Sequence, residues 1–151
     1  MDYVEKNQAP GETILKVGGM LLLFLGVLLA FGSGNNLSLV MKGSSDSAVV
    51  EYLNQNGMTY SQLVASNVMV LVAGVIYLAA GVVGVKQAGK VENAGLCVGM
   101  GGLLIAEVVA EVIVTMIFGD FDPASVIRML MFPAIYMIGA VLNWQAKKAR
   151  R

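Results

Sequence analysis

The sequence predicts an all-α integral membrane protein, a four-helix transmembrane bundle with a short extracytoplasmic helix in its first loop. Composition is the first reason. Of the 151 residues, 57% are hydrophobic and 13% are charged, and the mean hydropathy is +0.74, whereas a soluble domain is nearer half apolar and about a quarter charged. The second reason is that the apolar residues form long blocks, as membrane helices do. We expect a single domain, residues 1–151.

The predicted spans cover about residues 13–31, 63–85, 94–118 and 125–144. Each is long enough to cross a hydrocarbon core as a helix, which takes about 20 residues. None has the polar–apolar alternation of membrane barrel strands. The first span has an alternative interpretation as a cleaved signal peptide, because Lys16 precedes its apolar run and Ala30 lies in a sequence that resembles a cleavage site.

The connections differ in length. Residues 32–62 are predicted to form an outer loop, which opens with a flexible stretch over 32–36 and contains a short helix from Asp46 to Asn54 that ends before Gly57. We interpret this helix as a loop element that lies on the helix ends, with a lid or a partner-docking element as the alternative. The last turn carries Asp122 and Pro123, which suit the cap and the first position of a helix.

Basic residues set the orientation. Those expected on one side are Lys6, Lys16, Lys86, Lys90, Lys147, Lys148, Arg150 and Arg151. Only Lys42 and Arg128 are expected on the other side. The positive-inside rule then places both termini, including the basic tail 145–151, in the cytoplasm, and the chain in the plasma (inner) membrane.

Several chemistries are excluded by composition. The chain has no histidine, which removes His-ligated haem and catalytic triads that use an imidazole base. Its one cysteine, Cys97, is expected to be a small buried apolar side chain, and the ten methionines are interpreted as packing rather than as a copper site. The net charge of zero gives no support for nucleic-acid binding. We expect no catalytic site, no cofactor and no metal site.

Small residues recur along the third span at spacings of three and four, which places them on one helical face. They are Gly95, Gly99, Gly102, Ala106 and Ala110. Such residues let helix backbones approach closely in lipid, and Gly95 with Gly99 makes a GxxxG pair. The stripe therefore predicts helix packing, either within the bundle or in a homodimer. The first two spans offer Gly19 with Gly26, and Gly74 with Gly81, for the same purpose.

Two carboxylates, Glu107 and Glu111, interrupt the third span. They lie four residues apart, so they share nearly one helical face. The span's Leu, Ile, Val and Phe residues favour insertion by roughly 4–7 kcal/mol in total, and two central charges would cost about 5–7 kcal/mol. At least one of the two is therefore expected to be protonated, paired or hydrated. The expected partner is Arg128, close to Glu111, with Asn67, Tyr77 and Tyr136 as further polar groups nearby.

This polar cluster has several interpretations. Our first prediction is a small membrane protein of structural or accessory type, in which a buried Glu/Arg cluster fixes the packing of the helices. The main alternative is an oligomeric proton- or cation-linked small transporter or channel that uses Glu107 and Glu111. Acid/base catalysis on a lipid, and pairing with a basic residue of another membrane protein, are two further alternatives. The expected partners are the lipid bilayer and either a second copy of the chain or another membrane protein.

Overall fold

The computed structural model describes residues 9–118 and 122–150, apart from the side chain of residue 35. Within these ranges every regular element is helical, which confirms the all-α fold class. Four of the helices are long and apolar enough to cross a membrane, as predicted. The elements in chain order are α1 (Glu12–Lys42), α2 (Ser47–Asn56), α3 (Tyr60–Gln87), η2 (Val91–Asn93), α4 (Ala94–Phe118) and α5 (Pro123–Ala149).

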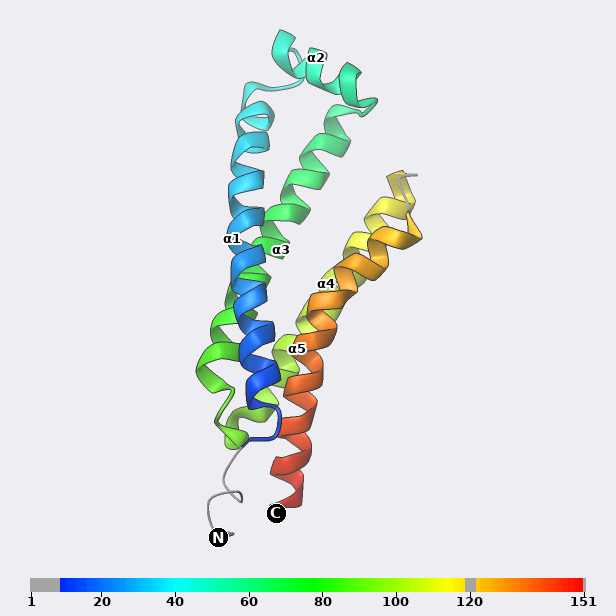
Figure 1. Ribbon diagram of the computed structural model, residues 1–151. Helices are drawn as coiled ribbons and strands as arrows, with labels where there is room; N and C mark the ends of the chain where they lie inside the picture. The colour runs from blue at the N-terminus through cyan, green and yellow to red at the C-terminus, as the bar shows by residue number, and fades with distance from the viewer. Residues whose placement is uncertain (1–8, 119–121, 151) are drawn as a thin grey trace.

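The long helices form two antiparallel arms (Figure 1). Helices α1 and α3 pair along most of their length, and α4 pairs with α5. The arms pack together at the end where α1 begins and α5 ends, which we call the terminal end. They diverge toward the other end, where α2 lies across the tops of α1 and α3; we call this the α2 end. The divergence leaves the facing sides of α3 and α4 partly apart from each other.

The short helix in the first connection is present, and it begins one residue later and ends two residues later than predicted. Asp46 caps α2, since its carboxylate accepts hydrogen bonds from the backbone N–H groups of Ala48 at 2.9 Å and Val49 at 3.4 Å. Gly57 ends the helix at φ 62°, a left-handed conformation that glycine adopts without strain. Asp122 and Pro123 begin α5 as expected, with the Asp122 carboxylate accepting from Ala124 N at 3.0 Å.

The prediction of a flexible loop after residue 31 is wrong. Helix α1 continues without a break to Lys42, so the Gly- and Ser-containing stretch is helical. Within this stretch the Ser33 hydroxyl donates to the Ala30 carbonyl at 2.9 Å. Farther along, the Tyr60 hydroxyl at the start of α3 donates to the Val40 carbonyl at 2.8 Å. This bond satisfies one of the carbonyls that the last turn of a helix leaves without a partner.

Close contact between α1 and α3 rests on glycines, as their spacing predicted. A Cβ built on Gly81 would lie 2.7 Å from the Gly19 carbonyl oxygen, and one on Gly26 would lie 3.0 Å from the Gly74 carbonyl oxygen. Only glycine permits so close a backbone approach at these two crossing points. The paired glycines, seven residues apart on each helix, therefore hold the first arm together.

Tyr136 of α5 is fully buried where the two arms meet. Its backbone lies against Gly18 of α1, and its ring lies against Gly84 of α3 and Gly101 of α4. A Cβ on Gly84 would come within 2.6 Å of the ring. Glycines on three helices thus form a socket for one aromatic side chain, and this packing closes the terminal half of the bundle.

A buried amide secures the terminal end. The Asn143 side chain of α5 is fully buried, and its Oδ1 accepts a hydrogen bond from Gly11 N at 2.8 Å. Its Nδ2 donates to the Ala88 carbonyl at 2.8 Å. Gly11 caps the start of α1 and Ala88 the end of α3, so one side chain satisfies backbone groups that two helix ends leave unpaired.

The small-residue stripe on α4 faces outward for most of its length. Gly95 packs against the Trp144 ring of α5, but no atom of another element lies within 4 Å of a Cβ built on Gly99 or Gly102. Ala106 and Ala110 are exposed as well. The interpretation of the stripe as packing within the bundle is therefore wrong beyond Gly95. The physical reason is that α4 buries the neighbouring face instead, which carries Cys97, Gly101, Leu104 and Val108.

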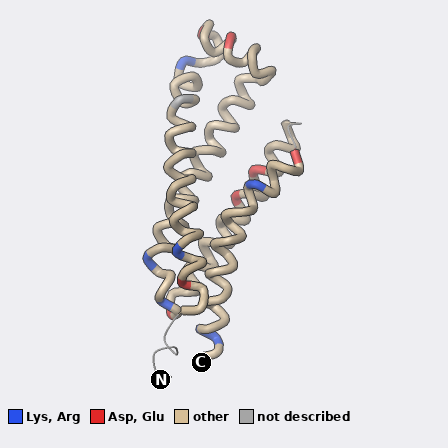
Figure 2. The backbone as a smooth tube through the Cα atoms, viewed as in Figure 1, with Lys and Arg blue, Asp and Glu red and all other residues tan. Residues whose placement is uncertain are grey.

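The surface of the long helices is apolar. Large side chains such as Phe24, Phe31, Ile117 and Ile127 are exposed, a pattern that monomeric soluble proteins avoid. Apart from Glu107 and Glu111 within α4 and Arg128 in the second turn of α5, charged positions of the long helices lie toward the helix ends, and most basic ones lie at the terminal end (Figure 2). This distribution is the one expected of a multi-pass membrane protein.

Candidate functional site: carboxylates between the arms

The two carboxylates of α4 lie where the arms begin to separate. Glu107 is 5% exposed, and neither of its carboxylate oxygens has a hydrogen-bond partner within residues 9–118 and 122–150. Glu111 lies one turn, about 6 Å, closer to the α2 end and is half-buried. The two side chains are close enough to interact electrostatically. An unpaired, buried carboxylate is costly, which makes this pair the main candidate for a functional site.

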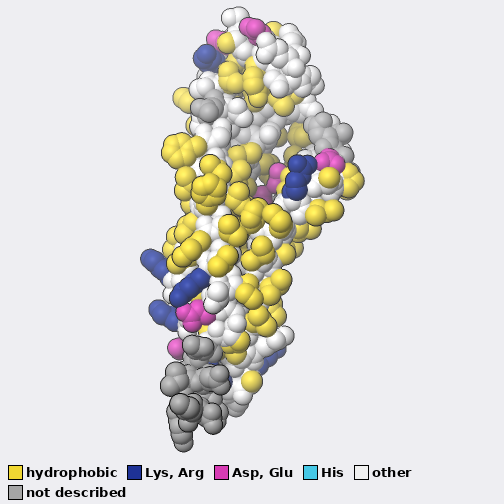
Figure 3. Space-filling model, viewed as in Figure 1, with side chains coloured by type: hydrophobic (Ala, Val, Ile, Leu, Met, Phe, Trp, Pro, Cys, Tyr) yellow, Lys and Arg dark blue, Asp and Glu magenta, His cyan; other side chains and the backbone are white. Residues whose placement is uncertain are grey.

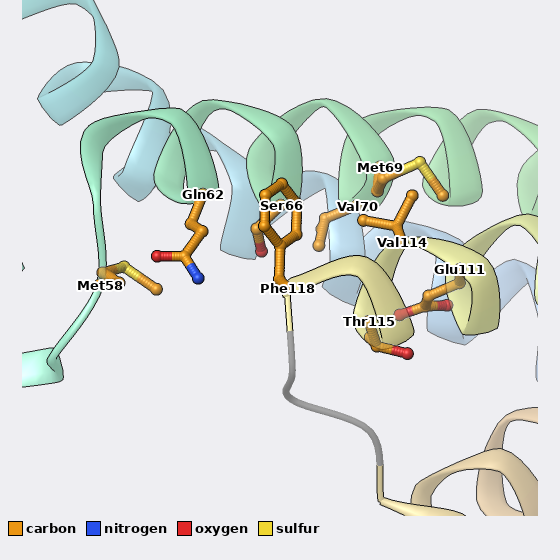
Figure 4. A pocket seen from close by; sticks show the side chains of 9 residues that line it. All are labelled: Met58, Gln62, Ser66, Met69, Val70, Glu111, Val114, Thr115 and Phe118. Carbon is orange, nitrogen blue, oxygen red and sulfur yellow. The ribbon is translucent and has the colours of Figure 1, made fainter.

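Glu111 lines a narrow cavity between α3 and α4 at the α2 end, with a volume of about 120 Å³. Its other polar lining groups are Gln62 and Ser66 from α3 and Thr115 from α4, as Figure 4 shows. Met58, Met69, Val70, Val114 and Phe118 complete the wall. A volume of this size has room for a few water molecules beside the polar groups of Glu111, Gln62, Ser66 and Thr115.

Glu111 also lines a second, wider cavity of about 300 Å³ between the arms. This cavity is mostly apolar, with residues from α1, α3 and α5 around the one carboxylate. The space-filling view shows acidic side chains recessed in the hollow between the arms, beside a basic group at its rim (Figure 3). The lining residues are Leu25, Leu29, Val70, Ala73, Tyr77, Glu111, Arg128, Met129 and Phe132.

The predicted ion pair between Glu111 and Arg128 is wrong. The Arg128 guanidinium instead pairs with the Asp122 carboxylate at 3.3 Å, and its Nε donates to the Ala124 carbonyl at 3.3 Å. The side chain is 74% exposed. Arg128 lies near the start of α5, so its long side chain reaches the polar helix end more easily than the carboxylates deeper in the bundle. Arg128 does line the wider cavity with Glu111, at its rim.

The other predicted members of the cluster separate in the structure. Tyr77 of α3 lines the wider cavity, within electrostatic range of Glu107 and Glu111. Asn67 is buried with its Oδ1 unpartnered among the described residues, but it lines neither cavity. It shares the helical face of Gly74, which packs against α1. Tyr136 lies in its glycine socket, away from both cavities and near the buried Cys97 thiol.

Sequence reasoning missed three polar residues of the narrow cavity, namely Gln62, Ser66 and Thr115. A signal was present, because Gln62 and Ser66 are four residues apart on one face of α3, and Thr115 follows Glu111 by four on α4. These residue types are common near helix ends, however, so the pattern becomes informative only once the two faces are known to oppose each other.

Nothing in the described ranges groups three or more His, Cys, Asp or Glu side chains as a metal site would require. Carboxylates such as Glu107 and Glu111 can bind a proton or a cation. The chain matches no protein-family model, no curated protein and no solved structure.

Proposed function

We propose that this chain is a proton- or cation-linked small transporter or channel that uses Glu107 and Glu111. The observation that carries the proposal is a buried carboxylate, Glu107, without a partner among the described residues, next to a second one that lines two cavities. The structural alternative relied on an ion pair with Arg128, which binds Asp122 instead. Ionisable groups held in apolar surroundings without a counter-charge are typical of ion and proton pathways.

The two ends of the site differ in access. Toward the α2 end, Gln62, Ser66 and Thr115 offer hydrogen-bonding groups along the narrow cavity. Toward the terminal end, Tyr136 packs against Gly101, about 9 Å along α4 from Glu107. This arrangement supports a site open to one end of the bundle and closed to the other, as one state of alternating access would be.

The proposed function includes an orientation of the bundle in the membrane. Lys16, Lys86 and Lys90 lie at the terminal end with the basic end of α5, and the positive-inside rule assigns such an end to the cytoplasm. The α2 end and its short helix would then lie outside the plasma membrane. The carboxylates would be reached from outside the cell in this state.

The test is ion flux in proteoliposomes driven by a pH gradient, with wild type compared with Glu107→Gln. Glutamine keeps the size and hydrogen-bonding capacity of the side chain but cannot titrate, so flux should vanish while the size-exclusion profile is unchanged. Glu51→Gln is the matched control, because Glu51 lies on α2, lines neither cavity, and accepts a hydrogen bond from the Gln55 side chain at 3.1 Å. Flux that persists in the Glu107→Gln variant would sink the proposal.

A second candidate function is an accessory protein that binds another membrane protein or a second copy of itself. The outward face of α4 supports it, since Gly99 and Gly102 leave room for a close helix there. Stable co-purification with another membrane protein, lost on Gly99→Ile and Gly102→Ile without loss of folding, would favour this function. Co-purification that survives both changes would exclude this face as the interface.

A further inference from the structure

The wider cavity is lined mainly by aromatic and aliphatic side chains, which binding of a proton or an inorganic ion does not require. Aromatic rings from Tyr77 and Phe132, and aliphatic side chains from Leu25 and Leu29, surround the carboxylate of Glu111. A small inorganic cation needs oxygen ligands rather than aromatic and aliphatic walls. At about 300 Å³ the cavity has the volume of the smallest ligand pockets in proteins.

One carboxylate within apolar and aromatic walls matches an organic ammonium group. The carboxylate supplies the counter-charge, and aromatic faces attract a cation that carries little hydration. The like charge of Arg128 is turned to the rim, where Asp122 and the Ala124 carbonyl hold the guanidinium. Glu111 therefore remains available as the acceptor.

We propose that this cavity binds a compact apolar organic cation, an alkyl- or arylammonium, with its charged nitrogen at Glu111 and its apolar part against Phe132 and Tyr77. The inference rests on the proposed function, because it names the cation that the transporter would carry. Inorganic ions and protons would reach the same carboxylate through the narrow cavity.

Glu111 borders both cavities, so ligands in either one can reach its carboxylate. A proton that arrives through the narrow cavity and an ammonium group in the wider one compete for the same carboxylate. The other charged or titratable groups that face it are Glu107 from α4, Tyr77 from α3 and Arg128 from α5, while α1 supplies only leucines to the cavity. Ammonium binding therefore weakens as acidification protonates Glu111, which would couple the two fluxes in opposite directions.

The test is equilibrium binding of radiolabelled benzyltrimethylammonium to the full chain in detergent, with no gradient present. Glu111→Gln should weaken binding by about thirtyfold or more, as expected when a buried charge pair loses one partner. Phe132→Leu should weaken it by about threefold or more through loss of the ring. Arg128→Gln should leave binding intact or tighten it, and Glu51→Gln should leave it unchanged.

Competing ligands separate the alternatives. Neopentylbenzene has the shape of the probe with carbon in place of the charged nitrogen, and it should not displace the probe. If neopentylbenzene displaces the probe from the wild-type protein with the affinity of the probe itself, the site recognises apolar shape rather than charge, and the inference is overturned. Benzylsulfonate binding that is lost in Arg128→Gln would overturn it in favour of an anion site.

Flux and binding measurements test the transporter and the organic-cation site independently of each other. If gradient-driven ion flux depends on Glu107 but no probe binding depends on Glu111, the organic-cation inference falls and the transporter proposal stands. If the probe binds through Glu111 but no flux is found with any cation, the cavity is a binding site and the transporter proposal falls. Each Gln variant is checked by its size-exclusion profile, so loss of binding is not confused with loss of folding.

Discussion

Asn143 shows how a single amide can join three helices. Its side chain is fully buried and bonds Gly11 N and the Ala88 carbonyl, both at 2.8 Å. Asn143→Ala removes both bonds and leaves two backbone groups unsatisfied, so the free energy of unfolding should fall by about 2 kcal/mol or more. Chemical unfolding in detergent measures the change. Asn93→Ala is the control, because its side-chain amide is exposed and donates to the Gln87 side chain. An equal loss in both variants would contradict the role of Asn143.

Loss of the Arg128 side chain, in contrast, should change the stability of the protein very little. Its ion pair with Asp122 is exposed on both sides, and such pairs contribute about 0–1 kcal/mol. Arg128→Ala should therefore change the free energy of unfolding by less than about 1 kcal/mol, whereas loss of a buried partner of Glu111 would cost about 3–5 kcal/mol. The double change with Glu111→Leu should be additive with the two single changes. A coupling between residues 111 and 128 larger than about 1 kcal/mol in a double-mutant cycle would restore the predicted pair.

For single residues, the sequence predicted the burial of Glu107 but not the contacts of Arg128. The burial of Glu107 followed from an apolar span whose carboxylates are costly to expose to lipid. Asn143 and Thr115 were missed, because helical periodicity gives the face of a residue but not the face of the neighbour that it meets. The predicted Arg128 pair is wrong for a related reason, because the position of a residue along a helix does not say toward which end its side chain reaches.

At the scale of whole helices, glycines decide which surfaces meet. Gly84→Ala would place a Cβ 2.6 Å from the ring of Tyr136, and such overpacking costs about 1–3 kcal/mol. Gly102→Ala meets nothing within 4 Å and should be neutral or stabilising, since alanine favours helix by about 1 kcal/mol. Unfolding of the monomer in detergent compares the two. Equal destabilisation would mean that the outward face of α4 is packed in solution.

The ends of the helices were predictable where side chains cap them. Asp46, Gly57, Asp122 and Pro123 each occur where their local chemistry favours a helix end or start. The far end of α1 was not predictable, because its Gly- and Ser-containing stretch has low helix propensity. Contacts from α3, such as the Tyr60 bond to Val40, supply what local preference lacks. Tertiary packing decided that boundary, and it also decided which face of α4 is buried.

The whole molecule is a pair of arms joined at one end, and its function depends on which side of the membrane the open end faces. In the proposed orientation the basic terminal end lies in the cytoplasm, as the positive-inside rule predicts. Ser44 is exposed between α1 and α2, and Lys148 is exposed at the end of α5. A cysteine at position 44 in a Cys97→Ala background should therefore react with an impermeant reagent on intact cells. A cysteine at position 148 should react only after the cells are lysed, and the reverse pattern would place the carboxylate cavities open to the cytoplasm.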